Sequence, residues 1–557
     1  MYTKDEKQDK LFWLLMMGLA FSSLTYLFFS DQVLLRGEET MHLARIEGIR
    51  EGLLCGQLPV RIHAFQFNGY GTPEGIFYPD IFLYPMAVMR MAGLGFGVVY
   101  NSYWLMVYLL VFWAGWYAYR LLSGSWGRGA MAAILYGTQF IFLWGLGNMM
   151  SSLAYGFMPL AFVSCYLILK GKDGARLWPW LVLATTVIIQ SHVICTLLTV
   201  AGYLAICLCC HRGLLERDRR LALLKAAGLS MVLNLWRLVA FLYMYEKLDF
   251  RIKEPEVYHA GFNSLHLITS DWYNLLLAQC WLGIPVLVLL GFFLVYHRNR
   301  MGQERGFYLS AAGTLVLVAG VTEYFPWHAI ELLPWLGGFL PKLQFSLRFV
   351  PLGMVPLAYY LGSYLVEMLL ERRRCLAGMG AVCLAVCGAT VWTLQENIDF
   401  YIGGNHLTNK IRYDAYAELP SYGGLEDYLY SDIWFRDMRN RQGQVPQPGD
   451  IYTEAEVTSF AKRGTSIDMA YRADRETAAR LPLFYYPGYH AYLDGEGHEV
   501  PLLEGEQHLM HAVLPAGSHR VEIRYGGLWF FRAADWLSAA GLAVFLWLWY
   551  REGRRMP

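Results

Sequence analysis

Long apolar runs, separated by short groups of Lys and Arg, recur along almost the whole chain. A helix needs about 20 mostly apolar residues to cross a bilayer. The runs near that length are Leu11–Phe29, Ser102–Tyr119, Ala130–Leu146, Ser152–Leu169, Leu221–Tyr245, Asn274–Tyr296, Phe307–Val321, Phe345–Leu370, Leu376–Leu394 and Leu528–Tyr550. A further stretch, Leu177–Cys210, is long enough for two shorter helices with a turn at Ser191 and His192. The pattern therefore predicts a polytopic α-helical membrane protein.

The first apolar run follows lysines, as the core of a signal peptide does. It is longer than such a core, however, and it ends in Phe28, Phe29, Ser30 and Asp31 without a small-residue cleavage pattern. We therefore expect this run to be a retained membrane anchor.

One segment decides on which side of the membrane the later loops lie. Ile76–Leu94 is apolar but contains two prolines, Asp80 and Arg90. Counting it as a span moves every later basic group to the other side. Cytoplasmic loops collect Lys and Arg, so we treat the segment as interfacial or re-entrant, which puts the basic groups on the side of the N-terminus. This choice predicts about twelve spans with both termini cytoplasmic.

The same choice divides the chain into three parts. Residues 1–394 are expected to form the transmembrane core, with an outer loop at 30–99 that carries the chemistry. Residues 395–527 are expected to form an extracytoplasmic domain, and 528–557 a final helix with a basic cytoplasmic tail.

The second half of the outer domain reads as strands separated by turn signals such as Asp494-Gly495. The predicted strands are Ser466–Tyr471, Leu483–Tyr486, His490–Leu493, His508–Leu514 and His519–Tyr525. They predict a small antiparallel β-sandwich.

Composition agrees with a membrane protein and excludes several other classes. Of the 557 residues, 56% are hydrophobic and 16% are aromatic, which fits aromatic rings at membrane interfaces. The net charge of only +1 argues against a nucleic-acid partner. No Walker loop, dinucleotide fingerprint, HExxH or nucleophile elbow occurs, so no cofactor is expected. No outer loop carries Asp-x-Asp, so the sequence does not demand a bound metal.

An acidic pair follows the first apolar run at Glu38 and Glu39, with His42 and Arg45 behind it. Carboxylates at a membrane face are costly to desolvate. If the segment is helical, Glu38, His42 and Arg45 share one face, which favours Glu38 over Glu39 as a catalytic base. The alternative is that both carboxylates stabilise the first turn of an interfacial helix through its dipole.

Three cationic residues are candidate ligands of an anionic headgroup. Arg237 lies within an apolar span, where an arginine is by default a functional candidate, or else reaches the outer interface. Lys342 and Arg348 flank the point at which an outer loop re-enters the membrane, so they either hold a phosphate or anchor a helix start. His192 is better explained as a hydrogen-bonded structural residue. The tyrosines of the tail either stack on sugar rings or pack in the sandwich.

These segments resemble the YfhO-like bacterial membrane proteins, which belong with the GT-C glycosyltransferases. In the first outer loop the resemblance rests on the acidic pair with His42 and Arg45, and on two aromatic motifs. The motifs of the resemblance are Gly69-Tyr70-Gly71, Phe77-Tyr78-Pro79, Leu343-Gln344-Phe345-Ser346-Leu347-Arg348, Tyr485-Tyr486-Pro487-Gly488-Tyr489 and Pro515-Ala516-Gly517. The order of these weak motifs carries the resemblance, which extends over most of the chain. One departure is the segment 148–153, which lacks the Arg and Glu that relatives tend to carry there.

The resemblance implies an inverting glycosyltransferase in the bacterial plasma membrane with its active site on the outer face. It implies a polyprenyl-phosphate-linked sugar as donor, a cell-envelope polymer or lipid as acceptor, and a first-loop carboxylate as base. The expected catalytic residues are Glu38, Glu39 and His42. The expected substrate-binding residues are Arg45, Tyr70, Tyr78, Arg237, Lys342, Gln344 and Arg348. Two other hypotheses remain open: a flippase or transporter of lipid-linked sugars, and a non-catalytic envelope scaffold that binds sugar.

Overall fold

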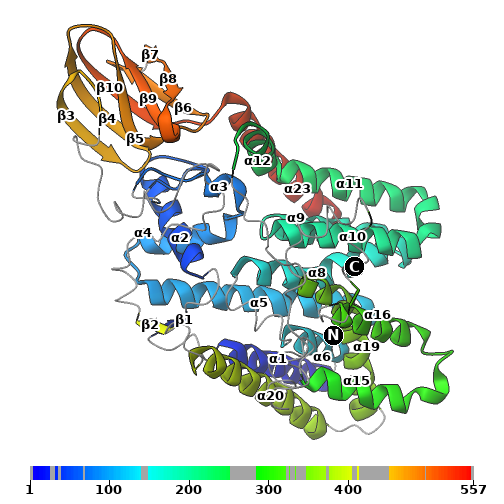
Figure 1. Ribbon diagram of the computed structural model, residues 1–557. Helices are drawn as coiled ribbons and strands as arrows, with labels where there is room; N and C mark the ends of the chain where they lie inside the picture. The colour runs from blue at the N-terminus through cyan, green and yellow to red at the C-terminus, as the bar shows by residue number, and fades with distance from the viewer. Residues whose placement is uncertain are drawn as a thin grey trace.

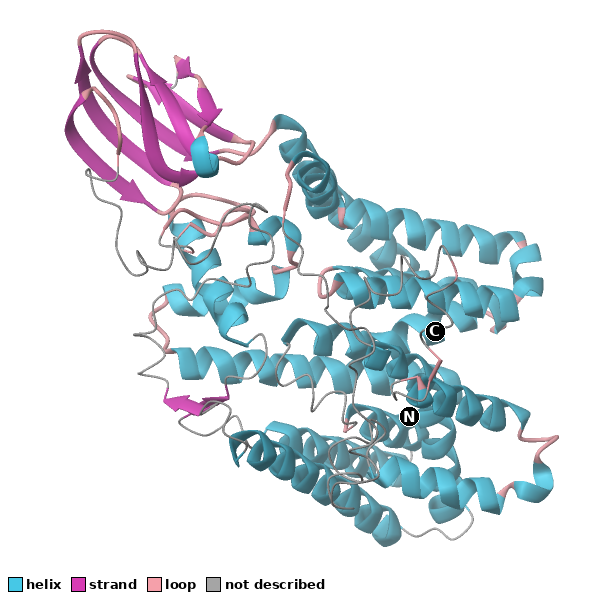
Figure 2. Cartoon of the chain, viewed as in Figure 1, coloured by secondary structure: helices cyan, strands magenta, loops and turns pink. Residues whose placement is uncertain are grey.

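The computed structural model has a large helical body and a β-sandwich at one end of it (Figures 1 and 2). The structure describes residues 4–25, 32–34, 39–64, 66, 69–138, 149–250, 284–320, 325–326, 333, 346–371, 376–403, 410–412, 451–495 and 497–553. The predicted class, a mostly helical chain with several long apolar helices and a C-terminal β-rich part, is confirmed at that level.

The helical body is built mainly from apolar helices. Their bounds are α1 Lys4–Thr25, α2 Glu39–Leu54, α3 Glu74–Phe77, α4 Tyr84–Met91, α5 Phe96–Ser123, α6 Trp126–Gly137, α8 Met149–Lys170, α9 Trp178–Ile189, α10 Val193–Cys209, α11 Arg217–Leu233, α12 Leu235–Lys247, α15 Ile284–Tyr296, α16 Arg305–Ala319, α19 Val350–Val366, α20 Leu376–Gly403 and α23 Trp529–Gly553. Within the described ranges, four helical stretches are long and apolar enough to cross a membrane: α5, α8, α19 with the turn after it, and α23. The bent pair of α11 and α12 makes up to five, so the count of about twelve spans stays a prediction.

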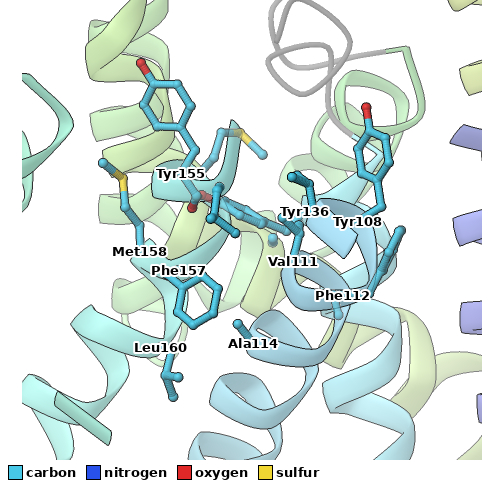
Figure 3. Close-up of a cluster of buried hydrophobic side chains, with 14 of the residues drawn as sticks. Tyr108, Val111, Phe112, Ala114, Tyr136, Tyr155, Phe157, Met158 and Leu160 are labelled. Carbon is cyan, nitrogen blue, oxygen red and sulfur yellow. The ribbon is translucent and has the colours of Figure 1, made fainter. Parts of the chain in front are cut away.

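The centre of the helical body is formed by α5, α6 and α8 (Figure 3). Val111 and Phe112 of α5 are buried together with Phe157 and Met158 of α8. A Cβ at Gly156 would collide with Val111, so only glycine lets these two helices approach this closely. Close van der Waals packing of aromatic and aliphatic side chains, which the small residue Gly156 permits, holds this centre together.

Two predictions about the middle of the chain have different outcomes. The stretch Leu177–Cys210 does form two short helices, α9 and α10, with a turn between them. The predicted single span Leu221–Tyr245 is two helices, α11 and α12, which meet at Asn234 with a bend of 66°; together they are long and apolar enough for one broken span or a re-entrant loop. A helix breaks in this way where a side chain enters its hydrogen-bond ladder. Here Ser538 of α23 does so: its hydroxyl donates to the Val232 carbonyl (2.8 Å) and accepts from the Trp236 amide (2.9 Å).

The segment that decided the topology is broken into short pieces. Within Ile76–Leu94 lie the end of α3, a 3-10 turn at Ile81–Leu83, and α4. None of these pieces is long enough to cross a bilayer. This is the local structure that an interfacial segment requires.

The β-rich part is an antiparallel sandwich of two sheets. One sheet has the order β3-β4-β10-β6-β7 and the other β5-β9-β8. The strands are β3 Glu456–Arg463, β4 Ser466–Ala473, β5 Thr477–Phe484, β6 Tyr489–Leu493, β7 Glu499–Val500, β8 Leu502–Glu504, β9 Leu509–Leu514 and β10 Gly517–Tyr525; a separate small ladder joins β1 Gln32–Leu34 to β2 Lys410–Arg412. Four predicted strands overlap β4, β6, β9 and β10, whereas β5 begins earlier than predicted and ends at Phe484.

The sandwich shares its core with the loop region that follows the first helix. Ile62, Tyr70 and Phe77 from that region are buried in one cluster with Phe484 and Tyr486 of the sandwich. The Phe484 amide donates to the Tyr70 carbonyl at 3.0 Å. The sandwich therefore covers the loop on which the candidate chemistry lies (Figure 1).

Candidate functional site

Helix α2 presents His42 and Arg45 to the protein interior, and neither residue is exposed to solvent. They lie three residues apart and so meet on one helix face, as the sequence predicts. An Arg45 Nη1 donates to His42 Nδ1 at 3.1 Å. Glu38 lies outside the described residues. Glu39 is the first residue of α2, but its side chain is not among those described.

Arg45 hydrogen-bonds to the backbone of residues 77–80, a segment called the 77–80 turn from here on. Its Nη2 donates to the Pro79 carbonyl at 2.6 Å and to the Tyr78 carbonyl at 3.3 Å. Its guanidinium also lies over the Tyr78 ring, 4.6 Å from the ring centre. Arg45 thus fixes both the backbone and the aromatic side chain of this turn.

Arg237 holds the same turn from the other side. It lies in the first turn of α12, just after the break at Asn234, and is buried. Its Nη2 donates to the Phe77 carbonyl at 3.0 Å and its Nη1 to the Ile189 carbonyl at 3.3 Å. This guanidinium therefore lies inside the protein, at the start of α12 and directly after the bend between α11 and α12.

Asp80 ends the turn and is the residue that sequence reasoning missed. It is fully buried, and neither of its carboxylate oxygens makes a hydrogen bond within the described part of the chain. Burial raises the pKa of the Asp80 carboxyl from 3.8 to about 6, against the opposing pull of Arg45, His63, Arg237 and Arg61. A carboxyl with such a pKa can bind or release a proton near neutral pH. Its position in an otherwise apolar segment was the signal that could have identified it.

His63 lies between Asp80 and a second buried carboxylate, Glu74. Its Nε2 is 3.9 Å from Asp80 Oδ2, and its Nδ1 is 3.5 Å from Glu74 Oε2. Gln66 Nε2 donates to Glu74 Oε2 at 2.8 Å, and the Thr72 hydroxyl in turn bonds Gln66. Glu74 is therefore fixed by its neighbours with one oxygen toward the ring.

Arg348 approaches His192 from a separate part of the chain. It lies in the 3-10 turn Ser346–Phe349 and is largely buried. The charges of Arg348 and Arg237 both act on the His192 ring. That ring meets Tyr78 edge-on at 6.3 Å and caps α10, with Nδ1 accepting from the Cys195 amide at 3.4 Å. His192 is thus a hydrogen-bonded structural residue, as predicted. It contacts Tyr78 of the 77–80 turn, and the charge of Arg348 acts on the same ring.

The remaining predicted site residues lie elsewhere or outside the described ranges. Tyr70 is buried against Phe484, with ring centres 5.6 Å apart, so its ring belongs to the shared core. Lys342 and Gln344 lie outside the described residues. Among the tail tyrosines, Tyr486 and Tyr489 are buried, which favours packing over stacking on sugar rings.

The described residues contain no group of three or more His, Cys, Asp or Glu side chains that could hold a metal ion. Around His63 the reason is geometric, because the two carboxylates face opposite nitrogens of one ring. They cannot share one ion with that ring.

Comparison with known proteins gives matches among solved structures. No family model matches the chain, and no curated protein matches it in sequence. A solved structure that matches is the cryo-EM structure of the arabinofuranosyltransferase AftD from Mycobacteria, with 14% sequence identity and a TM-score of 0.41. The match covers 69% of this chain and 26% of that protein, so this chain spans about a quarter of its length. A TM-score of this size does not establish a shared fold, and the GT-C resemblance stays a prediction from the sequence.

Proposed function

We propose that the protein is a membrane glycosyltransferase. It would move a sugar from a polyprenyl-phosphate donor to an acceptor of the cell envelope, with its active site on the outer face of the plasma membrane. The observation that carries the proposal is a buried carboxylate, Asp80, without a hydrogen bond in the described part of the chain and surrounded by guanidinium groups. This places a candidate base in a positively charged part of the protein, which favours anionic substrates.

The proposed reaction is an inverting displacement. A carboxylate takes the proton of the acceptor hydroxyl as its oxygen attacks the anomeric carbon, and the bond from that carbon to the phosphate oxygen breaks. The phosphate keeps the electron pair, and a guanidinium stabilises its charge. Only one carboxylate is needed, because a phosphate is already a good leaving group, whereas a glycosidase needs two carboxyls that flank the bond.

We assign the role of base to Asp80, with Glu38 or Glu39 as the alternative from the sequence. The roles of His42 and Arg45 are to orient: Arg45 bonds the two carbonyls that precede Asp80, and His42 bonds Arg45. Arg348, with Lys342 and Gln344 on the same re-entering loop, is proposed to bind the donor phosphate. Arg237 supports the turn and adds to the positive charge of the site.

The test replaces the candidate bases in a strain that lacks the chromosomal gene, with envelope sugar and protein level as readouts. Asp80→Asn is expected to lower sugar transfer by about 10²–10⁴-fold, the usual contribution of a positioned base. Glu51→Gln is the matched control, because Glu51 lies on α2 but pairs with Arg50 near the surface.

Each outcome decides between the hypotheses. Full transfer in Asp80→Asn with loss in the Glu38→Gln/Glu39→Gln double variant would move the base to the acidic pair. Full transfer in both variants, at normal protein levels, would refute the glycosyltransferase proposal itself. Movement of labelled polyprenyl-phosphate sugar across proteoliposomes without any acceptor would support a flippase.

A further inference from the structure

The sandwich carries an open groove that has no part in the displacement described above. Its volume is about 610 Å³, and it is lined by residues 452–454, which lead into β3, and by residues 475–478, where β5 begins. Most of these residues are polar, and they include a tyrosine, two carboxylates and a guanidinium. We call this feature the 452–478 groove.

We propose that the 452–478 groove binds an uncharged polysaccharide, at a point of the chain that lies several sugar units from its reacting end. This inference rests on the proposed function, and it names the acceptor class: a polymer of neutral sugars, not a lipid or a single sugar. The groove would hold the polymer while its end is modified at the site near Asp80.

Tyr452 supplies a surface on which a sugar ring can stack. The residue is 52% exposed, and the Arg480 guanidinium covers one part of its ring, 4.0 Å from the ring centre. The exposed part of the ring lines the groove. The face of an aromatic ring is negative and attracts the polarised C–H groups on the apolar face of a sugar ring.

The position of this tyrosine is set before any ligand binds. The Tyr452 amide donates to the Arg480 carbonyl at 3.2 Å, and the Arg480 amide donates to the Tyr452 carbonyl at 2.9 Å. Arg480 therefore holds Tyr452 through the backbone as well as through the side chain. A side chain that is already fixed loses less conformational entropy when a ligand binds.

An ion pair on the rim of the groove can bind sugar hydroxyls. Arg475 Nη2 donates to Glu454 Oε2 at 2.6 Å, and the two side chains are 77% and 69% exposed. A pair this exposed adds little to stability. Both groups have more hydrogen-bonding positions than this one contact uses, so the carboxylate can accept from one hydroxyl while the guanidinium donates to its neighbour.

The charges of the groove favour an uncharged ligand. Glu454 and Glu476 bring two negative charges, and Arg475 and the Arg480 beneath the ring bring two positive charges, so the formal charges cancel. An acidic polymer would meet the two carboxylates, and an apolar chain would desolvate charged groups without pairing them. A neutral ligand rich in hydroxyls meets neither cost.

The distance from the groove to the loop favours a polymer. Strand β5 begins at the groove with Thr477 and ends at Phe484, whose amide bonds the Tyr70 carbonyl. A strand of this length spans roughly 20 Å. A ligand that occupies the groove and also reaches the loop region must therefore contain several sugars, and holding it at the groove raises the effective concentration of its end near Asp80.

The binding test uses the full chain in nanodiscs. The probes are neutral pentose, hexose and N-acetylhexosamine chains from disaccharides to octasaccharides, with hyaluronan fragments as acidic chains of matched length. Wild type is expected to bind a neutral series with an affinity that rises with length. Tyr452→Ala is expected to weaken this binding by about 10-fold, the effect of losing one aromatic anchor, whereas Tyr452→Phe keeps the ring and the affinity.

Tyr492→Ala is the matched control. The Tyr492 ring also lies against a guanidinium, that of Arg524 at 4.7 Å, but it does not line the groove. Its loss is expected to leave binding unchanged. Arg475→Gln and Glu454→Gln are each expected to weaken binding by about 3–10-fold, the contribution of a hydrogen bond, with unchanged melting temperatures because the pair is exposed.

The kinetic test measures transfer to an envelope polysaccharide fraction from a strain without the protein, and to a short acceptor prepared from it by hydrolysis. Tyr452→Ala is expected to raise the KM for the polysaccharide by about 10-fold with kcat unchanged, because the groove acts on binding and not on the chemical step. Transfer to the short acceptor, which cannot reach the groove, is expected to stay as in wild type.

The outcomes separate this inference from the function on which it rests. Wild type that binds no neutral series, that prefers hyaluronan fragments, or that loses binding equally in Tyr452→Ala and Tyr492→Ala overturns the groove, while an inactive Asp80→Asn keeps the function. An equal rise in KM for the polysaccharide and the short acceptor also overturns it. Full transfer in Asp80→Asn and in the Glu38→Gln/Glu39→Gln double variant refutes the function and, with it, the acceptor role of the groove.

Discussion

Three consecutive backbone carbonyls, those of Phe77, Tyr78 and Pro79, accept hydrogen bonds from two buried arginines. These hydrogen bonds fix the positions of the two guanidinium groups, and therefore the positions of their positive charges. The residue after these carbonyls is Asp80, which therefore lies in a field that does not need to rearrange when the charge of the carboxyl changes. Preorganised charge of this kind is a main source of catalytic stabilisation.

The raised pKa of Asp80 predicts how stability depends on pH. The folded protein binds this proton more tightly than the unfolded chain does, so the stability contribution is greatest below the ordinary pKa of 3.8 and is lost as pH rises through about 6. The difference between the two pKa values corresponds to about 3 kcal/mol. Asp80→Asn, which cannot ionise, is therefore expected to gain stability relative to wild type by about that amount between pH 4 and pH 7.

Thermal unfolding of both proteins in the same detergent, followed across this pH range, measures the difference. Asp468→Asn is the control, because its hydrogen bond with Arg520 lowers the pKa of the Asp468 carboxyl below 3.8. Its difference from wild type should therefore stay constant above about pH 4.5. Parallel melting curves for Asp80→Asn and wild type would contradict a raised pKa at Asp80.

At the scale of elements, α2 contributes to the site through a glycine as much as through its charged face. Gly48 lets the His63 ring rest on the helix backbone. Gly48→Ala places a Cβ within 3 Å of three ring and side-chain atoms of His63, and we expect a loss of about 1–3 kcal/mol, as for other overpacked cores.

The matched control is Gly228→Ala, within α11, where no atom lies within 4 Å of the added Cβ. That change is expected to stabilise by about 0.5–1 kcal/mol, because alanine loses less conformational entropy in a helix. The melting temperatures of the two variants should move in opposite directions. A Gly48→Ala protein as stable as Gly228→Ala would show that His63 does not pack on α2 in this way.

The break between α11 and α12 is a second element whose geometry rests on one side chain. Ser538→Ala leaves the Val232 carbonyl and the Trp236 amide without the hydroxyl that bonds both. We expect a loss of about 1–3 kcal/mol in stability, the cost of unsatisfied buried groups. Ser310→Ala is the control, since that hydroxyl bonds Gly306 within its own helix. Equal melting temperatures for the two variants would contradict the role of Ser538 at the break.

An element can be predicted from the sequence when the residues that determine it are close together in the chain, and not when they come from distant segments. Strands β4, β6, β9 and β10 were found because alternation and turn residues are local signals. The edge strand β3 was missed, since it is mostly exposed and has little apolar alternation. The break at Asn234 was missed because the inserted hydroxyl comes from Ser538, far along the chain. Asp80 was missed because its burial among arginines depends on α2 and α12 together.

At the scale of the whole molecule, the loop that follows the first helix is held from two sides. The sandwich packs against Tyr70, while Arg61 of the loop pairs with Asp535 of the last helix, α23, at 2.7 and 3.4 Å. Arg532 of α23 also donates to the Leu58 carbonyl at 2.6 Å. The C-terminal quarter of the chain therefore fixes the position of the loop that carries Asp80, which gives the β-rich tail a structural role in the proposed chemistry.

The Arg61–Asp535 pair allows this coupling to be measured. The Arg61 side chain is only 2% exposed and that of Asp535 16%, so removing Asp535 leaves a buried guanidinium without its carboxylate, whereas removing Arg61 leaves Asp535 with Arg532 at 3.7 Å. Asp535→Leu is expected to cost about 3–5 kcal/mol in stability, the usual result of breaking a buried pair, and Arg61→Met is expected to cost less because Asp535 keeps Arg532. The double variant is expected to be closer to wild type than either single one, because it leaves no charge behind. The surface pair Arg475–Glu454 is the control, and its removal should have no measurable effect. Losses in the double variant that equal the sum of the single losses would show that the loop and α23 are not coupled through this pair.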